Sequence, residues 1–124
     1  MHIDTHVAVW LYAGEVERFP APARRLLDQS ELVISPMVLL EIQFLREAGK
    51  LELRPERFLR EMKQDLGLKV CEAAFPDIIF SAVELSWTRD PFDRFITAQA
   101  AVNEAPLMTR DKTIRTHYRR AVWD

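Results

Sequence analysis

Short apolar stretches alternate with longer segments of helical spacing along this chain, and that alternation constrains its fold more than any other feature. The apolar stretches are predicted to be strands at residues 2–5, 31–34, 68–73, 106–109 and 121–123. Helices are predicted over residues 7–11, 21–30, 36–48, 55–67, 76–85, 90–100 and 112–116. The alternation predicts an α/β fold with three layers, α/β/α, around a short, mainly parallel sheet of four to five strands.

The segment from Thr88 to Ala100 carries the clearest helix start. Asp90 is predicted to cap the helix, and Pro91 suits its first position, where no N–H is needed. Asp93 then falls in the first turn, beside the apolar face of the helix. Two explanations remain open: both carboxylates only cap the helix, a contribution of ~1 kcal/mol, or Asp93 helps to hold a cation at the edge of the sheet.

The composition is that of a globular protein with one core, since 48% of the 124 residues are apolar and 29% are charged. We therefore expect a single domain over residues 1–124. The one cysteine, Cys71, cannot form an internal disulfide, and the sequence has no signal-peptide pattern and no apolar run of ~20 residues. The expected location is the cytoplasm, with no attachment to a membrane.

Three acidic residues stand where such a fold would bring them together. Asp4 lies where a predicted strand meets a helix, Asp111 follows a predicted strand, and Asp93 lies at the start of a helix. Ligands of open parallel sheets bind beyond the carboxyl ends of the strands, where residues in these positions converge. Each of the three could also serve only as a helix cap, with Thr5 competing with Asp4 for that role.

Glu41 is unusual for a different reason. Its neighbours at three and four positions along the predicted helix 36–48 are all apolar, and a carboxylate on such a stripe costs free energy unless it is paired or binds a metal ion. One explanation is an ion pair with one of the chain's arginines. We favour a place in a functional site, because acidic groups on a core-facing stripe are typical of such sites.

Four converging carboxylates would repel one another by roughly 3 kcal/mol per pair at a separation of ~5 Å and an effective dielectric constant of ~20. A cation among them, or raised pKa values, would relieve that repulsion. A site made only of oxygen ligands suits Mg²⁺ or Mn²⁺. The sequence offers no Cys/His cluster for zinc and no glycine-rich loop for a nucleotide.

The formal net charge of −2 does not by itself indicate a nucleic-acid partner. That total hides a local excess of cations toward the C-terminal end, where a single acid, Asp111, occurs among them. The cations are Arg110, Lys112, Arg115, Arg119 and Arg120. Two explanations remain for this segment: its cations only face the solvent, or they form a surface that binds an anion.

Together these residues resemble the PIN-domain family, and within it the VapC-type toxin ribonucleases of prokaryotic toxin–antitoxin pairs. The resemblance rests on four motifs in family order: Ile3-Asp4-Thr5-His6-Val7 with Trp10, Ser35-Pro36 leading into Leu40-Glu41-Ile42, Arg89-Asp90-Pro91-Phe92-Asp93-Arg94, and Leu107-Met108-Thr109-Arg110-Asp111. They span essentially the whole chain. The implied metal ligands and catalytic acids are Asp4, Glu41, Asp93 and Asp111, with Thr5 and Thr109 as polar support. Asp90 is either a further ligand or only a helix cap.

The resemblance also implies a function, that of a Mg²⁺- or Mn²⁺-dependent endoribonuclease that acts as the toxin of a toxin–antitoxin pair. The expected partners are RNA, a cognate antitoxin and a second copy of the chain in a homodimer. The residues expected to hold the RNA backbone are Arg89, Arg94, Arg110, Lys112 and Arg115. Helices 36–48 and 55–67 are expected to clamp a protein partner, because Phe44, Leu45 and Phe58 exceed the needs of one small core.

Two other functions remain open. A catalytically silent PIN-like module that binds RNA or protein would keep the fold and lose affinity for metal, and the presence of all four acids argues against it. A phosphorelay receiver domain would need a phosphorylatable aspartate on a central strand and a lysine at a strand end. The sequence shows no such lysine.

Overall fold

The computed structural model describes residues 1–124 and contains a five-stranded sheet in which every strand is parallel to its neighbours. The strands are β1 (His2–Ile3), β2 (Val33–Ile34), β3 (Lys69–Val70), β4 (Leu107–Met108) and β5 (Ala121–Val122). Their order across the sheet is β3-β2-β1-β4-β5. The predicted fold class, parallel pairing and strand number are confirmed.

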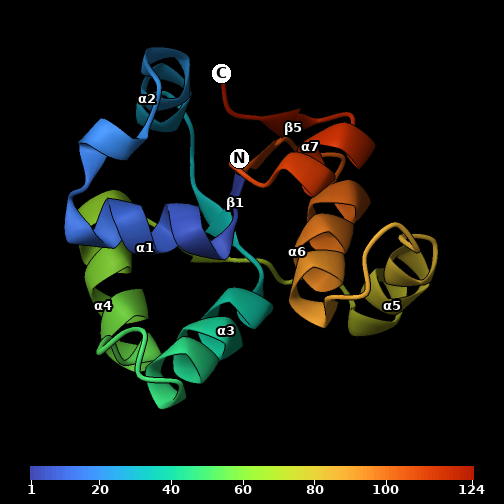
Figure 1. The fold of residues 1–124 in the computed structure, drawn as a ribbon, viewed down its shortest axis with the longest axis horizontal. Coiled ribbons are helices and arrows are strands. Elements are labelled where there is room, and N and C mark those ends of the chain that lie inside the picture. The colour runs from blue at the N-terminus through green and yellow to red at the C-terminus, as the bar shows by residue number, and fades with distance from the viewer.

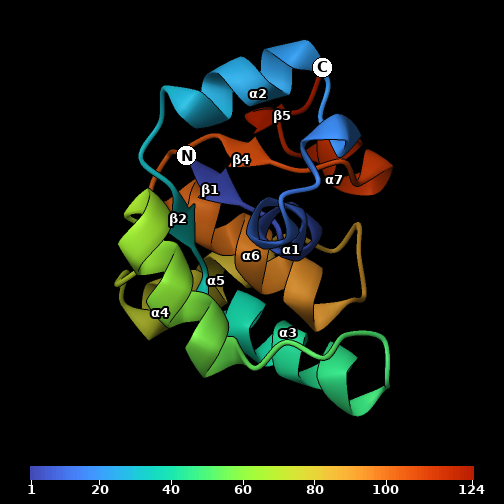
Figure 2. The same cartoon turned by 90° about the vertical axis from the view of Figure 1, so that its left-hand side faces the viewer.

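Helices cover both faces of this sheet. They are α1 (Thr5–Ala13), α2 (Ala21–Asp28), α3 (Pro36–Glu47), α4 (Pro55–Leu66), α5 (Phe75–Val83), α6 (Pro91–Val102) and α7 (Lys112–His117), with a 3₁₀ turn, η1 (Val16–Arg18), after α1. Figure 1 shows α1, α2 and α4 on one side of the strands and α5, α6 and α7 on the other. In the turned view of Figure 2, α1, α2 and α4 stand in front of the strands and α6 lies behind them. The three predicted layers are therefore present.

The direction in which strands are added reverses at β1. The chain moves outward from β1 to β2 and β3, and then returns to place β4 and β5 on the other side of β1. The carboxyl ends of β1 and β4 consequently lie side by side, and the Asp4 N–H donates to the Met108 carbonyl at 3.0 Å. In open α/β sheets a ligand crevice forms at such a reversal.

Each strand pairs over two residues, which is shorter than the predicted stretches. Side-chain caps explain the early end of two of them, because a cap turns the backbone into a helix directly after the strand. Asp4 caps α1 by accepting from the Thr5 N–H, and Ser35 caps α3 by accepting from the Met37 N–H. Asp4, and not its neighbour Thr5, is therefore the N-cap of α1.

The main core is a cluster of 19 buried apolar residues that joins the sheet to the helices of both faces. Phe58 belongs to this core with no exposed surface, so the expectation that it is left over for a partner was wrong. The reason is that α4 turns Phe58 toward the sheet, where its ring lies 5.9 Å from that of Tyr12. Phe44, in contrast, is 51% exposed and contacts Phe92 edge to face.

None of the helices combines the length and the apolar character that a membrane span requires.

Candidate active site

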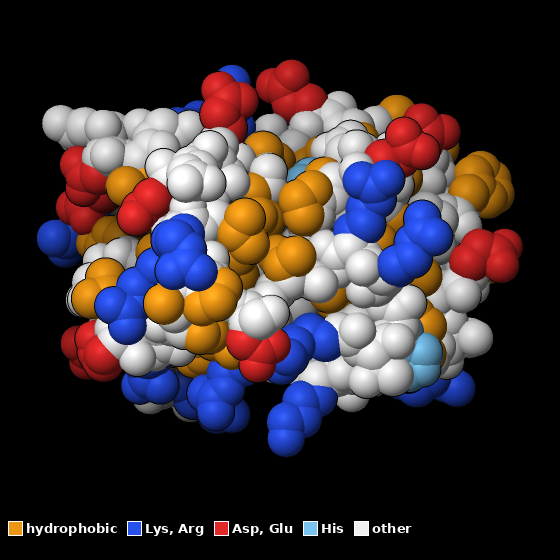
Figure 3. Space-filling view, turned by 90° about the horizontal axis from the view of Figure 1, so that it is seen from above, with side chains coloured by type: hydrophobic (Ala, Val, Ile, Leu, Met, Phe, Trp, Pro, Cys, Tyr) orange, Lys and Arg blue, Asp and Glu red, His pale blue; other side chains and the backbone are white.

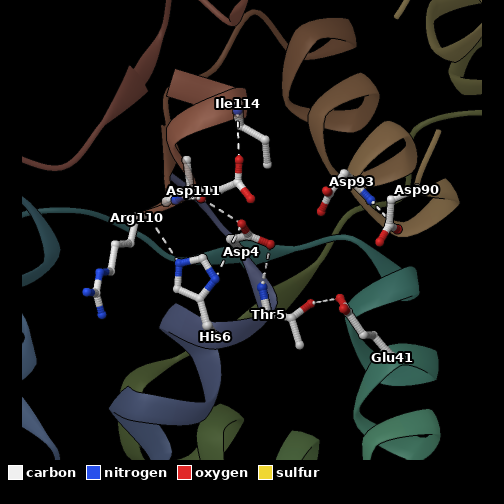
Figure 4. Close-up of polar contacts among 10 residues, drawn as sticks. Asp4, Thr5, His6, Glu41, Asp90, Asp93, Arg110, Asp111 and Ile114 are labelled. Carbon is white, nitrogen blue, oxygen red and sulfur yellow. Dashed lines mark hydrogen bonds and ion pairs between the residues drawn. The ribbon is translucent and has the colours of Figure 1, made fainter. Parts of the chain in front are cut away.

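A cleft of about 420 Å³ opens at the carboxyl ends of β1 and β4, at the reversal of strand order. Five carboxylates line it, and Figure 4 shows that they come from the starts of α1, α6 and α7 and from within α3. They are Asp4, Glu41, Asp90, Asp93 and Asp111. The structure thus brings the four predicted acids together, and Asp90 with them.

Asp4 is the most firmly held of these carboxylates. It is 4% exposed, and it accepts hydrogen bonds from the Thr5 N–H at 2.8 Å and from the Thr109 hydroxyl at 2.6 Å. The Thr109 hydroxyl oxygen in turn accepts from the Asp111 N–H at 3.0 Å. Thr109 therefore links the ends of β1 and β4 through one buried hydroxyl, which supports its predicted role as a polar neighbour of the acids.

Asp111 is the N-cap of α7, where one of its oxygens accepts from the Ile114 N–H at 2.9 Å. The cap uses Oδ1 only, and Oδ2 makes no hydrogen bond within the chain. A cap and a ligand are therefore compatible roles for this residue, because each needs a different oxygen.

Glu41 reaches the cleft from the second turn of α3. The Thr5 hydroxyl donates to its Oε1, and no lysine or arginine forms an ion pair with it. Burial raises the pKa of Glu41, and repulsion from Asp4 and Asp90 raises it further against the lowering effect of the Thr5 hydrogen bond. The alternative explanation of Glu41 as an arginine partner is therefore wrong.

Asp93 shows the strongest electrostatic perturbation of the group. Burial raises its pKa, and repulsion from Asp90, Asp4, Asp111 and Glu41 adds to this, so that the pKa reaches about 7. Asp93 therefore ionises only with difficulty in the absence of a bound cation.

Asp90 differs from Asp93 in both exposure and bonding. It is exposed at the N-terminus of α6, where its Oδ1 accepts from the Phe92 N–H at 2.8 Å and from the Asp93 N–H at 3.3 Å. The predicted cap of α6 is confirmed. Asp90 also lines the cleft, so its second oxygen is free to face the other carboxylates.

His6, which was named in the first motif without a role in the site, also lines the cleft. Its Nε2 accepts from the Arg110 N–H at 3.0 Å, which leaves the ring proton on Nδ1, 3.6 Å from Asp4 Oδ2. Burial lowers the pKa of His6 even though Asp4 and Asp111 favour its charged form. A neutral His6 therefore holds the loop that carries Asp111 against the helix that follows Asp4.

Sequence reasoning also missed Trp10 and Lys50 as lining residues of the cleft. Lys50 follows α3 in a loop, and the Ala48-Gly49-Lys50 pattern indicates only the end of a helix. Trp10 lies in the predicted helix 7–11 and was named with the first motif, and its ring is only partly buried. No local signal in the sequence distinguishes Lys50 from an ordinary surface position.

The predicted RNA-binding cations occupy different surroundings. Arg110 and Lys112 are exposed, make no ion pair and border the acidic cleft. Arg94 donates to the Thr88 carbonyl at 2.7 Å, and Arg115 pairs with Asp124 at 2.7 Å, while Arg89 is exposed beside Asp90. Viewed from the side of α2, α7 and β5, Lys and Arg side chains gather along one edge of the surface, with apolar side chains between them (Figure 3).

The donor set of the cleft fits a hard divalent cation. Its ligating atoms are carboxylate and hydroxyl oxygens, and burial together with repulsion between the acids raises the pKa values of Glu41 and Asp93, which a bound cation would lower. No three His, Cys, Asp or Glu side chains are arranged to hold one ion between them. Mg²⁺ does not require such a cage, because it commonly binds one or two carboxylates directly and keeps several waters.

Comparison with known proteins adds the following. The family model described as PIN domain matches residues 1–119. Ribonuclease VapC22 of Mycobacterium tuberculosis (strain ATCC 25618 / H37Rv) is 28% identical over 123 residues, which cover 93% of this chain and 89% of the relative. The crystal structure of VapBC2 from Rickettsia felis, bound to a DNA fragment from their promoter, matches 99% of this chain and 98% of its own with a TM-score of 0.69. Its sequence identity is 18%, so this likeness shows the fold.

Proposed function

The chain belongs to the PIN-domain family, and on that premise we propose that it is a divalent-metal-dependent endoribonuclease acting as the toxin of a toxin–antitoxin pair. The observation that carries the proposal is the cleft lined by five carboxylates, none of which forms an ion pair with a lysine or arginine. The similarity to Ribonuclease VapC22 supports RNA as the substrate. Residues 1–124 would act as one domain, and Mg²⁺ or Mn²⁺ would be the cofactor in the cytoplasm.

In this function some of the acids would hold the metal ion and another would accept a proton. A bound Mg²⁺ or Mn²⁺ would polarise a phosphate oxygen and lower the pKa of the attacking water. Asp4 is already fixed by two hydrogen bonds, so it would bind the ion with little rearrangement, and Asp93 and Asp111 would hold the ion directly or through its waters. Glu41 keeps Oε2 free while Oε1 accepts from Thr5, and Oε2 would accept the proton of the water.

Cleavage of RNA by the purified protein is expected with Mg²⁺ or Mn²⁺ and is expected to stop in EDTA, because the reaction needs an ion among the carboxylates. The measurement is gel analysis of several structured RNAs incubated with each metal and with EDTA. Equal cleavage in both conditions would contradict the metal mechanism. No cleavage of any RNA with metal, together with RNA or protein binding, would instead support a catalytically silent PIN-like module.

We also propose two protein partners on two separate apolar surfaces. Leu40 and Phe44 are exposed on α3, whose residue Leu45 lines the acidic cleft, and an antitoxin segment there would cover the cleft. The fold shared with VapBC2 supports a partner of that kind. Phe80 and Val83 are 72% and 62% exposed on α5, where a second copy of the chain would bury them in a homodimer.

Two exposed phenylalanines allow these partners to be tested against each other. Phe80→Glu is expected to convert a dimer to a monomer and to leave antitoxin binding intact, because a charge in an apolar interface must be desolvated. Phe44→Glu is expected to weaken antitoxin binding tenfold or more and to leave the dimer intact. Light scattering and calorimetric titration with the cognate antitoxin measure both. The same response from both variants would contradict the assignment of separate surfaces.

A further inference from the structure

A second hollow, of about 370 Å³, adjoins the acidic cleft and is not used by the function described so far. It is lined by His6, Trp10, Arg110, Asp111 and Lys112. His6, Trp10 and Asp111 also line the acidic cleft, so the two hollows lie side by side. A molecule that reaches the carboxylates can therefore extend into this second space.

Trp10 gives the hollow a firmly anchored aromatic wall. Its ring contacts Phe19 with ring centres 5.9 Å apart and Trp123 with centres 6.1 Å apart, and both of these residues are buried. The ring itself stays partly exposed, and the His6 ring lies 4.9 Å from it at an angle of 55°. The Arg18 guanidinium also lies over the Trp10 ring, 5.1 Å from its centre. An aromatic ring that is held by buried neighbours and stays partly exposed beside a guanidinium is suited to stack a planar ligand.

The charge of the hollow is opposite to that of the cleft. The Arg110 guanidinium lies 6.0 Å from the centre of the Trp10 ring, and Lys112 lines the same space. Both side chains are exposed and neither pairs with a carboxylate. Figure 4 shows Arg110 on the side of His6 that faces away from Asp93, Asp90 and Glu41.

These features together match a nucleotide. Unpaired nucleobases stack on aromatic rings and on arginine guanidinium planes, and phosphates bind arginine and lysine. The neighbouring carboxylates would repel a phosphate unless a cation is bound among them. Arg110 and Lys112 in the second hollow attract a phosphate without any metal ion. The acidic cleft therefore suits the reacting phosphate with its metal ion, and the basic hollow suits the nucleotide next to that phosphate.

We propose that this hollow is a subsite for the nucleotide adjoining the scissile phosphate of single-stranded RNA. Its base stacks against Trp10 or the Arg110 guanidinium, and its phosphate binds Arg110 and Lys112. His6 is a positioning residue for the subsite, because its Nε2 accepts from the Arg110 N–H and fixes the backbone that carries Arg110. The choice of RNA as the substrate class rests on the proposed function, while binding of a base and a phosphate does not require cleavage.

The test is an NMR titration of the metal-free protein in EDTA, with nucleoside 5′-monophosphates and with ribose 5-phosphate as the matched ligand without a base. The three tryptophans give separate indole N–H signals, so Trp87, which stacks on His117 outside the hollow, serves as an internal control. The nucleotide is expected to shift the Trp10 signal, to leave the Trp87 signal unchanged and to bind about fivefold or more tightly than ribose 5-phosphate.

Variants assign the two parts of the ligand to their residues. Trp10→Leu is expected to remove the preference for the nucleotide over ribose 5-phosphate, and Trp10→Phe to keep most of it, because the phenyl ring still stacks. Lys112→Ala, at an exposed position that tolerates truncation, is expected to weaken both ligands by the same factor. Thermal melts show whether each variant is folded, and Lys112→Ala remains informative if Trp10→Leu does not fold.

Two results would overturn the subsite: equal binding of the two ligands to the parent protein, or no effect of Lys112→Ala on either ligand. If RNA is cleaved and the Trp10 signal does not move, the subsite is wrong and the nuclease assignment stands. If the nucleotide shifts the Trp10 signal and no RNA is cleaved with any metal, the subsite stands and the nuclease assignment is wrong.

Discussion

In Mn²⁺, the Asp93→Asn variant is expected to cleave RNA at least about 10²-fold more slowly than the parent protein. Asn keeps the shape and one acceptor oxygen of Asp93 but lacks the charge that attracts the ion. Burial first and repulsion from the other acids second raise the pKa of Asp93 to about 7, so its charge is costly in the absence of an ion. Initial cleavage rates and a calorimetric Mn²⁺ titration measure the loss of activity and of metal affinity.

Asp90→Asn is the matched control for that variant, because Asp90 stands three residues earlier at the same helix start. Its known role is to cap α6 through Oδ1, and an asparagine oxygen caps a helix as well as an aspartate oxygen. Stability is expected to change by no more than about 1 kcal/mol, with much of the activity retained. Loss of Mn²⁺ affinity in Asp90→Asn but not in Asp93→Asn would reverse the assignment.

The parent protein and Asp93→Asn are also expected to differ in how their thermal stability in EDTA depends on pH. The folded-state pKa of Asp93 is about 7, above its ordinary value of 3.8, so ionisation of Asp93 favours the unfolded chain. This contribution to stability is fully present below pH 3.8 and is lost as pH rises to about 7. Asp93→Asn should therefore melt at a higher temperature than the parent above pH 7, with the difference shrinking toward pH 4. A difference that does not depend on pH would contradict the raised pKa.

The second large effect is expected for Glu41→Gln, which should lower RNA cleavage about 10²-fold or more while the protein folds at least as well as the parent. Gln keeps an oxygen that can accept from the Thr5 hydroxyl. In the parent protein, burial raises the pKa of Glu41, so the ionised carboxylate lowers the stability of the fold at neutral pH. Gln carries no charge and removes that cost. Cleavage rates and thermal melts of the metal-free proteins at pH 7 are the measurements.

Glu47→Gln is the control on the same helix. Glu47 is exposed at the end of α3, where it accepts from Gln43 at 2.7 Å, and it does not line the cleft. Neither activity nor stability should change with that substitution. A loss of several kcal/mol of stability in Glu41→Gln would show that the charge of Glu41 is needed for folding, as in a broken buried ion pair, and would contradict its assignment to the site.

Local patterns predicted much of the fold because the interactions behind them join residues that are close in sequence. Caps show this most directly: Asp90 before Pro91 predicted the start of α6, and Ser35 before Pro36 predicted the start of α3. A side-chain oxygen reaches an N–H two or three residues ahead, so the sequence alone contains both partners. The short strands were overestimated in length, because the number of residues that pair depends on where neighbouring strands turn into helices.

The sequence by itself determined the α/β class, the parallel sheet and the placement of Asp4 and Asp111 after strands, since periodicity and strand–helix alternation encode these features. Only the tertiary structure decided which distant groups meet. Thr109 donates to Asp4 across 105 positions of sequence, and the Arg110 guanidinium lies 6.0 Å from the centre of the Trp10 ring. Packing also left Glu41 without an arginine and buried Phe58 completely. These outcomes follow from how helices settle on the two faces of the sheet, which no window of neighbouring residues contains.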